Sequence, residues 1–151
     1  MKIAFEWFDA DATILGIKVY WPICELEIRK KDGTWVPFIF KIDSGADMIL
    51  MKESDCRDLG YSLADCEQAQ FDTASDKAVK TRVRMLDVRI SGYVIDKIPI
   101  AFSASPIKTL LLGRAKLFET LDICFLHEHK NTIFASWYPT IFYNLSIGRR
   151  L

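Results

Sequence analysis

The residue best suited to take part in a reaction is a single aspartate between two apolar segments. Residues 38–50 read Phe-Ile-Phe-Lys-Ile-Asp-Ser-Gly-Ala-Asp-Met-Ile-Leu, so that Asp43-Ser44-Gly45 separates two strand-like runs. A carboxyl group at the end of an apolar strand lies in a partly dry environment, where its ionisation responds to neighbouring groups. Such a group can act as a general acid or base. The alternative interpretation is that Asp43 only closes an Asx-type turn, with Gly45 at positive φ.

A second informative segment lies further along the chain. Residues 109–118 read Thr-Leu-Leu-Leu-Gly-Arg-Ala-Lys-Leu-Phe, an apolar strand that ends at Gly113-Arg114 and enters a short helix. In their order and separation, the two segments resemble the retropepsin family, the single-domain aspartic proteases of retroviral type and their cellular relatives. The resemblance covers residues 35–125. It implies an aspartic endopeptidase that hydrolyses peptide bonds.

The resemblance assigns a role to each residue of the first segment. Asp43 corresponds to the catalytic aspartate, and Ser44 takes the place of the hydroxyl residue that ties the two active-site loops together. Gly45 and Ala46 complete the loop.

The resemblance also implies an ion pair beside this loop. Asp47 corresponds to a second acidic residue that is often found there, and Arg114 to the arginine that frequently pairs with it. A buried bidentate pair would fix the loop against the following helix. The alternative is two solvated surface charges that contribute under about 1 kcal/mol to stability.

The chain contains one Asp-Ser-Gly, whereas the chemistry of aspartic proteases needs two carboxylates that face each other across one water. The resemblance therefore implies a homodimer, because an isologous two-fold contact brings identical loops together. Two carboxylates about 3 Å apart share one proton. One Asp43 then takes a proton from the water while the other donates a proton to the scissile carbonyl oxygen. No metal or organic cofactor is implied.

The resemblance places a flap at residues 68–80, over an extended peptide or protein substrate. The expected substrate-binding residues are Ala46, Asp47, Thr73, Ala74 and Ser75. Flaps of this family usually carry glycines at the hairpin tip, whereas residues 71–77 contain none. A stiffer tip leaves a second hypothesis open: a catalytically silent dimeric module of the same fold that binds peptides or proteins. A third is an unrelated all-β structural domain in which the Asp-Ser-Gly is an ordinary turn.

The elements that must position these residues are mostly short strands. Residues 13–29 are rich in Ile, Val, Tyr and Trp, and Leu26 and Ile28 alternate with charged neighbours as in a half-buried strand. An Asp32-Gly33 turn leads to a returning strand over residues 35–42. Further strands are expected over residues 78–90, 93–102 and 121–126, and short helices over residues 52–59, ended by Gly60, and 113–120.

This pattern predicts an all-β fold, a closed acid-protease-type β-barrel with one or two short helices, active as a two-fold dimer. The chain has 151 residues without a repeat or a Gly/Ser/Pro-rich linker, which indicates one domain over residues 1–151. The remaining tail, residues 131–151, carries Trp137, Tyr138, Phe142 and Tyr143. We expect these side chains to pack in the core or at the subunit contact.

Composition excludes several classes of function. Twenty basic residues balance twenty acidic ones, so that no basic field attracts nucleic acid. The apolar runs are too short to cross a membrane, and Glu6 and Asp9 interrupt the position of a secretory signal, which predicts a cytoplasmic protein. The four cysteines have no metal-binding or disulfide spacing and are expected to be free thiols.

One further cluster invites a metal hypothesis. Cys124, His127, Glu128 and His129 are residue types that bind zinc. If the strand continued, His127 and His129 would share one face and Cys124 would lie on the other. Thiolate and imidazole are the usual zinc ligands, and no fourth ligand of these types lies close in sequence, so exposed histidines without a metal are the favoured interpretation.

Overall fold

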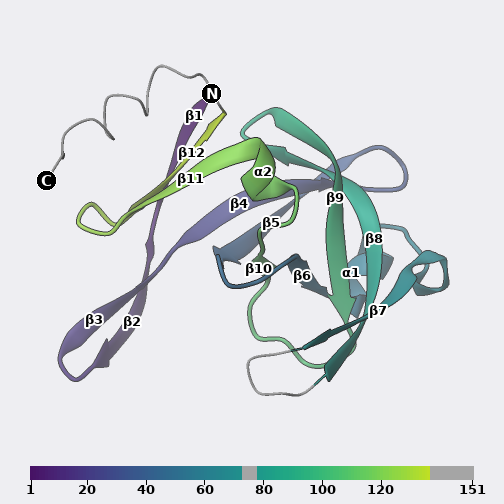
Figure 1. Ribbon diagram of the computed structural model, residues 1–151, viewed down its shortest axis with the longest axis horizontal. Helices are drawn as coiled ribbons and strands as arrows, with labels where there is room; N and C mark the ends of the chain where they lie inside the picture. Colours follow the sequence, from purple (N-terminus) through teal and green to yellow (C-terminus); the bar gives the residue numbers. More distant parts are fainter. Residues whose placement is uncertain (73–77, 137–151) are drawn as a thin grey trace, which may run out of the picture.

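The computed structural model of the protein describes residues 1–72 and 78–136. A sheet of seven strands has the order β4-β5-β10-β6-β9-β8-β7, and a pairing of β4 with β8 closes six of them into a barrel (Figure 1). These strands are β4 (Ile23–Arg29), β5 (Trp35–Ile42), β6 (Ile49–Lys52), β7 (Glu67–Asp72), β8 (Ala78–Ile90), β9 (Tyr93–Ser103) and β10 (Leu111–Leu112). The predicted closed β-barrel is therefore confirmed.

The barrel is filled by alternate side chains of its strands. Leu26 and Ile28 of β4 are fully buried, as their alternation with charged residues predicts, and Phe40 and Phe102 fill the core from β5 and β9. All four cysteines are free, as expected, and Cys124 is the one that is partly exposed.

The first predicted helix is confirmed and the second is shorter than expected. The helix α1 (Glu53–Asp58) ends before Gly60, whose φ of +83° suits the end of a helix, and a 3-10 turn η1 (Leu63–Asp65) follows. The helix α2 (Leu117–Thr120) begins four residues later than predicted. The reason is that Lys116, directly before α2, has a φ of +61°, which interrupts the predicted helix. The N–H groups of Arg114 and Ala115 donate to the carbonyls of residues 46 and 47, at 2.9 and 2.7 Å.

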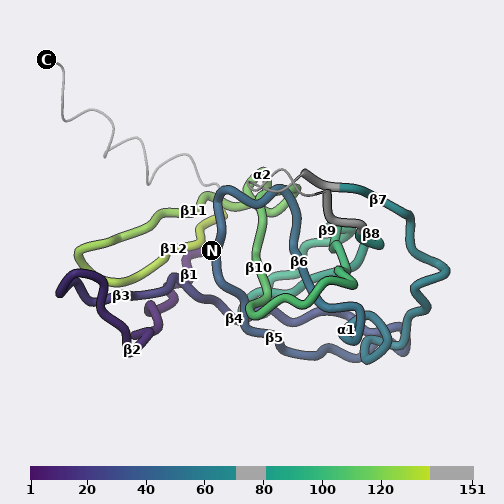
Figure 2. Tube along the Cα trace, turned by 90° about the horizontal axis from the view of Figure 1, so that it is seen from below, coloured from purple at the N-terminus to yellow at the C-terminus, as the bar shows by residue number. Residues whose placement is uncertain are grey.

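Two smaller sheets extend from one side of the barrel, on the left of Figures 1 and 2. One has the order β1-β12-β11 and consists of β1 (Lys2–Glu6), β12 (Asn131–Ser136) and β11 (Leu121–Leu126). The other is a hairpin of β2 (Phe8–Ile14) and β3 (Ile17–Trp21). The sequence pattern anticipated β11 but neither β1 nor the hairpin. Trp137, Tyr138, Phe142 and Tyr143 lie outside the described residues, so their packing stays a prediction.

The apolar stretch predicted over residues 13–29 is divided twice. Leu15 and Gly16 turn the chain between β2 and β3, and Gly16 has a φ of +80°. Pro22 then separates β3 from β4, because a proline has no N–H for a strand ladder. The carbonyl of Pro22 accepts the N–H of Ile42, the last residue of β5, at 2.8 Å.

The described residues contain no helix that is both long and apolar enough to cross a membrane.

The seam that closes the barrel carries an ion pair. Glu27 of β4 lies opposite Arg89 of β8, and the guanidinium binds both carboxylate oxygens at 2.5 Å while it covers the Trp35 ring. The hydrogen bonds from Arg89 hold the pKa of the Glu27 carboxyl below its ordinary value. The pair therefore links the charge state of Glu27 to the closure of the barrel.

We expect Glu27→Gln to lower stability at pH 7 and to lose this effect in acid. Since the pKa of Glu27 is lower in the folded than in the unfolded protein, its contribution is complete above the unfolded pKa and disappears as pH falls through the folded pKa. The difference in urea midpoint between the variant and the wild type should shrink as pH falls from about 5 to about 3. Glu25→Gln, at an exposed site on the same strand, is the control. A difference that stays constant with pH would contradict the assignment.

The strand β10 is held between the strands that enter and leave the Asp43 loop. It runs parallel to β5 and antiparallel to β6. Directly after β10, the backbone of Gly113 passes against the backbone of Met48, where a Cβ on Gly113 would lie 2.2 Å from the Met48 carbonyl oxygen. A side chain of any size is therefore excluded at position 113 unless the two segments separate.

We expect Gly113→Ala to lower the free energy of unfolding by about 2 to 3 kcal/mol, because the added methyl overlaps a main-chain carbonyl. Gly16→Ala is the matched control, since a Cβ there meets nothing within 4 Å and the cost is confined to the backbone strain of a positive φ. Urea unfolding of both variants measures the difference. Equal losses in the two variants would show that the close approach is unimportant.

Candidate active site

The main chain fixes Asp43 at the end of β5. Its neighbour Ile42 pairs with Leu112 of β10, and the N–H of Asp43 donates to the carbonyl of Leu112 at 3.0 Å. The Asp43 residue is half-buried, whereas the Ser44 and Gly45 that follow are exposed. The carboxylate thus stands at the edge of the core on a backbone with little freedom to shift.

A tight turn orients the carboxylate itself. The N–H of Gly45 donates to Oδ1 of Asp43 at 2.9 Å, and the N–H of Ala46 donates to the Asp43 carbonyl at 3.1 Å. Asp43 therefore does close an Asx-type turn. The positive φ that the turn-only interpretation gave to Gly45 is absent, because this residue is not among the glycines with left-handed backbone. Its lack of a side chain matters instead for space, since a Cβ would lie 3.2 Å from Oδ1.

Asp47 and Arg114 lie together beside this turn. Nη2 of Arg114 is 2.5 Å from Oδ1 of Asp47. The two side chains are 71% and 54% exposed, so the contact is a solvated one rather than the buried bidentate pair that was expected. An exposed pair contributes under about 1 kcal/mol. The bonds from residues 114 and 115 to the carbonyls of residues 46 and 47 hold the loop more firmly.

The flap region is described only at its base. The strands β7 and β8 form an antiparallel hairpin whose pairing extends from Glu67 opposite Val83 to Asp72 opposite Ala78. Thr73, Ala74 and Ser75 lie outside the described residues, so their contact with substrate stays a prediction.

Two positions that hold the loop were not singled out from the sequence. Met48 supplies the backbone against which Gly113 packs, and Leu112 supplies the carbonyl that accepts the N–H of Asp43. Both act through main-chain atoms, which any side chain at these positions would provide. The available signal was the glycine after three leucines, because a glycine at the end of a buried strand indicates close backbone approach.

The four residues of the metal hypothesis do not lie on one continuous strand. Cys124 lies on β11, which ends at Leu126, and residues 127–130 form a turn in which the His127 ring packs at 5.4 Å from Trp7. Within the described ranges, no group of three or more His, Cys, Asp or Glu side chains is arranged to hold a metal ion.

Comparison with known proteins agrees with this geometry. The family described as "gag-polyprotein putative aspartyl protease" matches residues 31–117, which include both the Asp43 loop and the Gly113 crossing. Among solved structures, a retropepsin-like aspartic protease from Rickettsia conorii is similar, with a TM-score of 0.54 and 18% identity over 86% of this chain and 95% of that one. At this identity the likeness concerns the fold. No curated protein sequence gives a match.

The match extends over more than half of the chain, and the fold agrees with the retropepsin-like barrel, so the hypothesis of an unrelated all-β domain is wrong. The half-buried aspartate, the turn that orients it and the glycine crossing that holds it all fall inside the matched segment. The chain therefore belongs to the retropepsin-like family of aspartyl proteases.

Proposed function

We propose that the protein is an aspartic endopeptidase that hydrolyses peptide bonds with a water activated between two Asp43 carboxyls of a homodimer. The observation that carries this proposal is the placement of Asp43. The residue is half-buried, its carboxylate is oriented by the Gly45 N–H, and its backbone is held between β5, β6 and β10. A carboxylate held in this way can be preorganised for proton transfer, because little reorganisation is needed when substrate binds.

A second copy of the chain supplies the partner carboxylate. Each chain has one Asp-Ser-Gly, and a two-fold axis beside the Asp43 loop would bring the two copies together. At a separation of about 3 Å the two carboxyls share one proton, so one accepts a proton from water while the other donates to the carbonyl oxygen. The Ser44 hydroxyls, which are exposed in the single chain, would then tie the two loops together.

The substrate would bind as an extended strand between the Asp43 loops and the flaps. An extended peptide satisfies its main-chain hydrogen bonds by adding to strand-like segments, and alternate side chains enter apolar subsites. Ala46 and Asp47 would form the floor of this groove, with Thr73, Ala74 and Ser75 above it. A cytoplasmic location and a single-domain organisation stay predictions from the sequence.

The silent binding module stays the alternative function because the flap has no glycine between residues 71 and 77. It shares the fold and the dimer with the enzyme and differs in chemistry. Incubation of the wild-type protein with a diverse peptide library between about pH 4 and 7 separates the two, since this range covers the titration of a carboxyl dyad. Cleavage supports the enzyme, and a stable dimer that binds peptides without cleavage supports the module.

We expect Asp43→Asn to lower the rate of peptide cleavage by a factor of at least about 100, because the amide can neither accept the proton of water nor donate an acidic proton. Folding and dimerisation should be unchanged, as measured by circular dichroism and solution mass. Asp58→Asn, at an exposed position on α1, is the matched control and should retain full activity. Cleavage by Asp43→Asn at the wild-type rate would refute the proposed role of this residue.

A mixing experiment tests whether the site is shared between chains. Refolding the wild type together with an equal amount of Asp43→Asn should remove about half of the activity, because random pairing leaves half of the wild-type chains in mixed dimers. A large excess of the variant should remove nearly all of it. Activity that does not respond to the variant would show that one Asp43 acts alone, as would a strictly monomeric solution mass of the active protein.

A further inference from the structure

Two buried cysteines lie in contact where the chain passes from the Asp43 region to the flap. The sulfurs of Cys56 and Cys66 are 3.9 Å apart, and the residues are 0% and 6% exposed. Cys56 lies on α1, which directly follows β6, and Cys66 directly precedes β7. The sulfurs of a disulfide lie about 2 Å apart, so a small movement of the two side chains would allow the bond to form.

The pair is held by its own connecting segment. Cys66 Sγ donates to the carbonyl of Ser62 at 3.5 Å, and Cys56 Sγ donates to that of Tyr61 at 3.9 Å. Both sulfurs therefore face the same short stretch of backbone. The enclosed loop is part of the compact α1–η1 connection and does not need to refold for the sulfurs to meet.

A cationic group borders this segment. The guanidinium of Arg84 on β8 covers the Tyr61 ring at 4.4 Å, and its Nη1 donates to the carbonyl of Asp65, the residue before Cys66. Burial and the neighbouring Cys66 raise the pKa of the Cys56 thiol to about 12, while nearby arginines oppose this rise. Cys66 is the more exposed of the two residues, at 6% against 0%, so an oxidant reaches its sulfur first.

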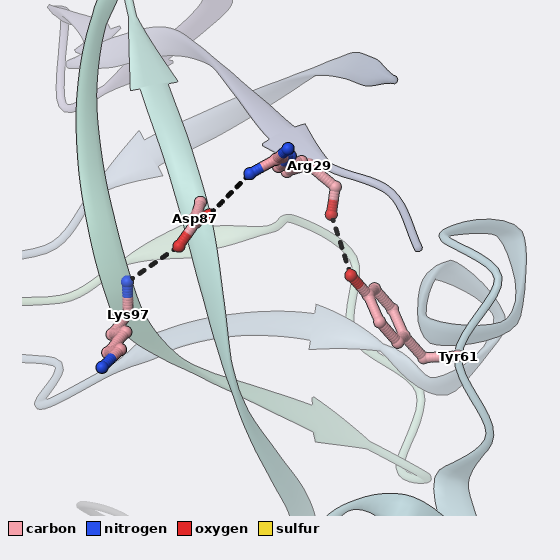
Figure 3. A network of polar contacts seen from close by, with 4 residues as sticks. All are labelled: Arg29, Tyr61, Asp87 and Lys97. Carbon is pink, nitrogen blue, oxygen red and sulfur yellow. Dashed lines mark hydrogen bonds and ion pairs between the residues drawn. The ribbon is translucent and has the colours of Figure 1, made fainter. Parts of the chain in front are cut away.

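The segment is also tied to the barrel (Figure 3). The Tyr61 hydroxyl donates to the carbonyl of Arg29 at 3.4 Å, and Arg29 in turn contacts Asp87 of β8 at 3.3 Å. Asp87 accepts the N–H of Lys97 on β9 at 3.1 Å. A covalent link from Cys66 to Cys56 would therefore connect the beginning of β7 to α1. The segment between α1 and β7 is already joined to the barrel strands β4, β8 and β9 through these contacts.

We propose that Cys56 and Cys66 are a redox modification site, which hydrogen peroxide converts into an intramolecular disulfide that fixes the base of the flap hairpin. In the first step, the Cys66 sulfur attacks one oxygen of hydrogen peroxide and loses its proton, the O–O bond breaks, and a sulfenic acid and water form. In the second, the Cys56 sulfur attacks the Cys66 sulfur and loses its proton, and the sulfenic oxygen leaves as water. The two thiols lose two electrons to the peroxide, which ends as two waters. A thiol reductant reverses the reaction.

The test uses the wild-type chain, oxidised with hydrogen peroxide and then unfolded and alkylated. We expect the loss of two of the four alkylatable thiols, and a peptide map in which a disulfide joins Cys56 to Cys66. Dithiothreitol should restore all four thiols. The oxidised protein should also show a Tm higher by roughly 5 to 10 °C, because the short ring restricts the unfolded chain.

Matched variants locate the reaction. Cys124→Ser removes the partly exposed thiol and should leave the disulfide unchanged, whereas Cys66→Ser should abolish it. Four free thiols after oxidation, a disulfide between other cysteines, or a disulfide between chains would each overturn the proposal. If Cys66→Ser fails to fold, the peptide map of the oxidised wild-type protein still shows whether Cys56 and Cys66 are joined. None of these readouts depends on peptide cleavage, so an inactive protein would leave this result intact.

Discussion

The approach of two backbones at Gly113 and Met48 is the constraint on which the candidate site depends. It places the end of β10 against the loop that carries Asp43, and three main-chain hydrogen bonds, from the N–H groups of Asp43, Arg114 and Ala115, join these two segments. Because neither partner is a flexible side chain, the position of the carboxylate is determined by the barrel itself. The adjacent Asp47–Arg114 contact is solvated and adds little to this rigidity. Backbone packing thus fixes the position of Asp43 and leaves its carboxylate available for chemistry.

Local sequence patterns predicted those parts of the fold whose cause is local. Alternation placed β4 and β8, an Asp-Gly pair placed the turn before β5, and Gly60 marked the end of α1, since each depends on neighbouring residues. The late start of α2 was not predictable in this way. Residues 114 to 116 are good helix formers, but Lys116 has a φ of +61° where the segment packs on a loop far away in the sequence. The pairing of β1 with β12 joins the two ends of the described chain and left no local signal.

The candidate site shows the same division. Asp43, its turn and the Gly113-Arg114 segment were recognisable from residue types and order. The exposure of the Asp47–Arg114 pair and the ordinary backbone of Gly45 were not, because both depend on how the loop rests on β10. Under the proposed function the site is also divided between two chains, so each barrel would provide a rigid half of it and the subunit contact would control catalysis. A single sequence describes one half only.

The junction at Pro22 links the projecting hairpin of β2 and β3 to this site. The same residue that ends the ladder of β3 accepts the N–H of Ile42, directly before Asp43. The tip of the hairpin is apolar, with Leu15 98% exposed. Because a two-stranded hairpin has little stability of its own, its attachment depends on this junction, and the chain that leaves it is tied to β5 one residue before Asp43.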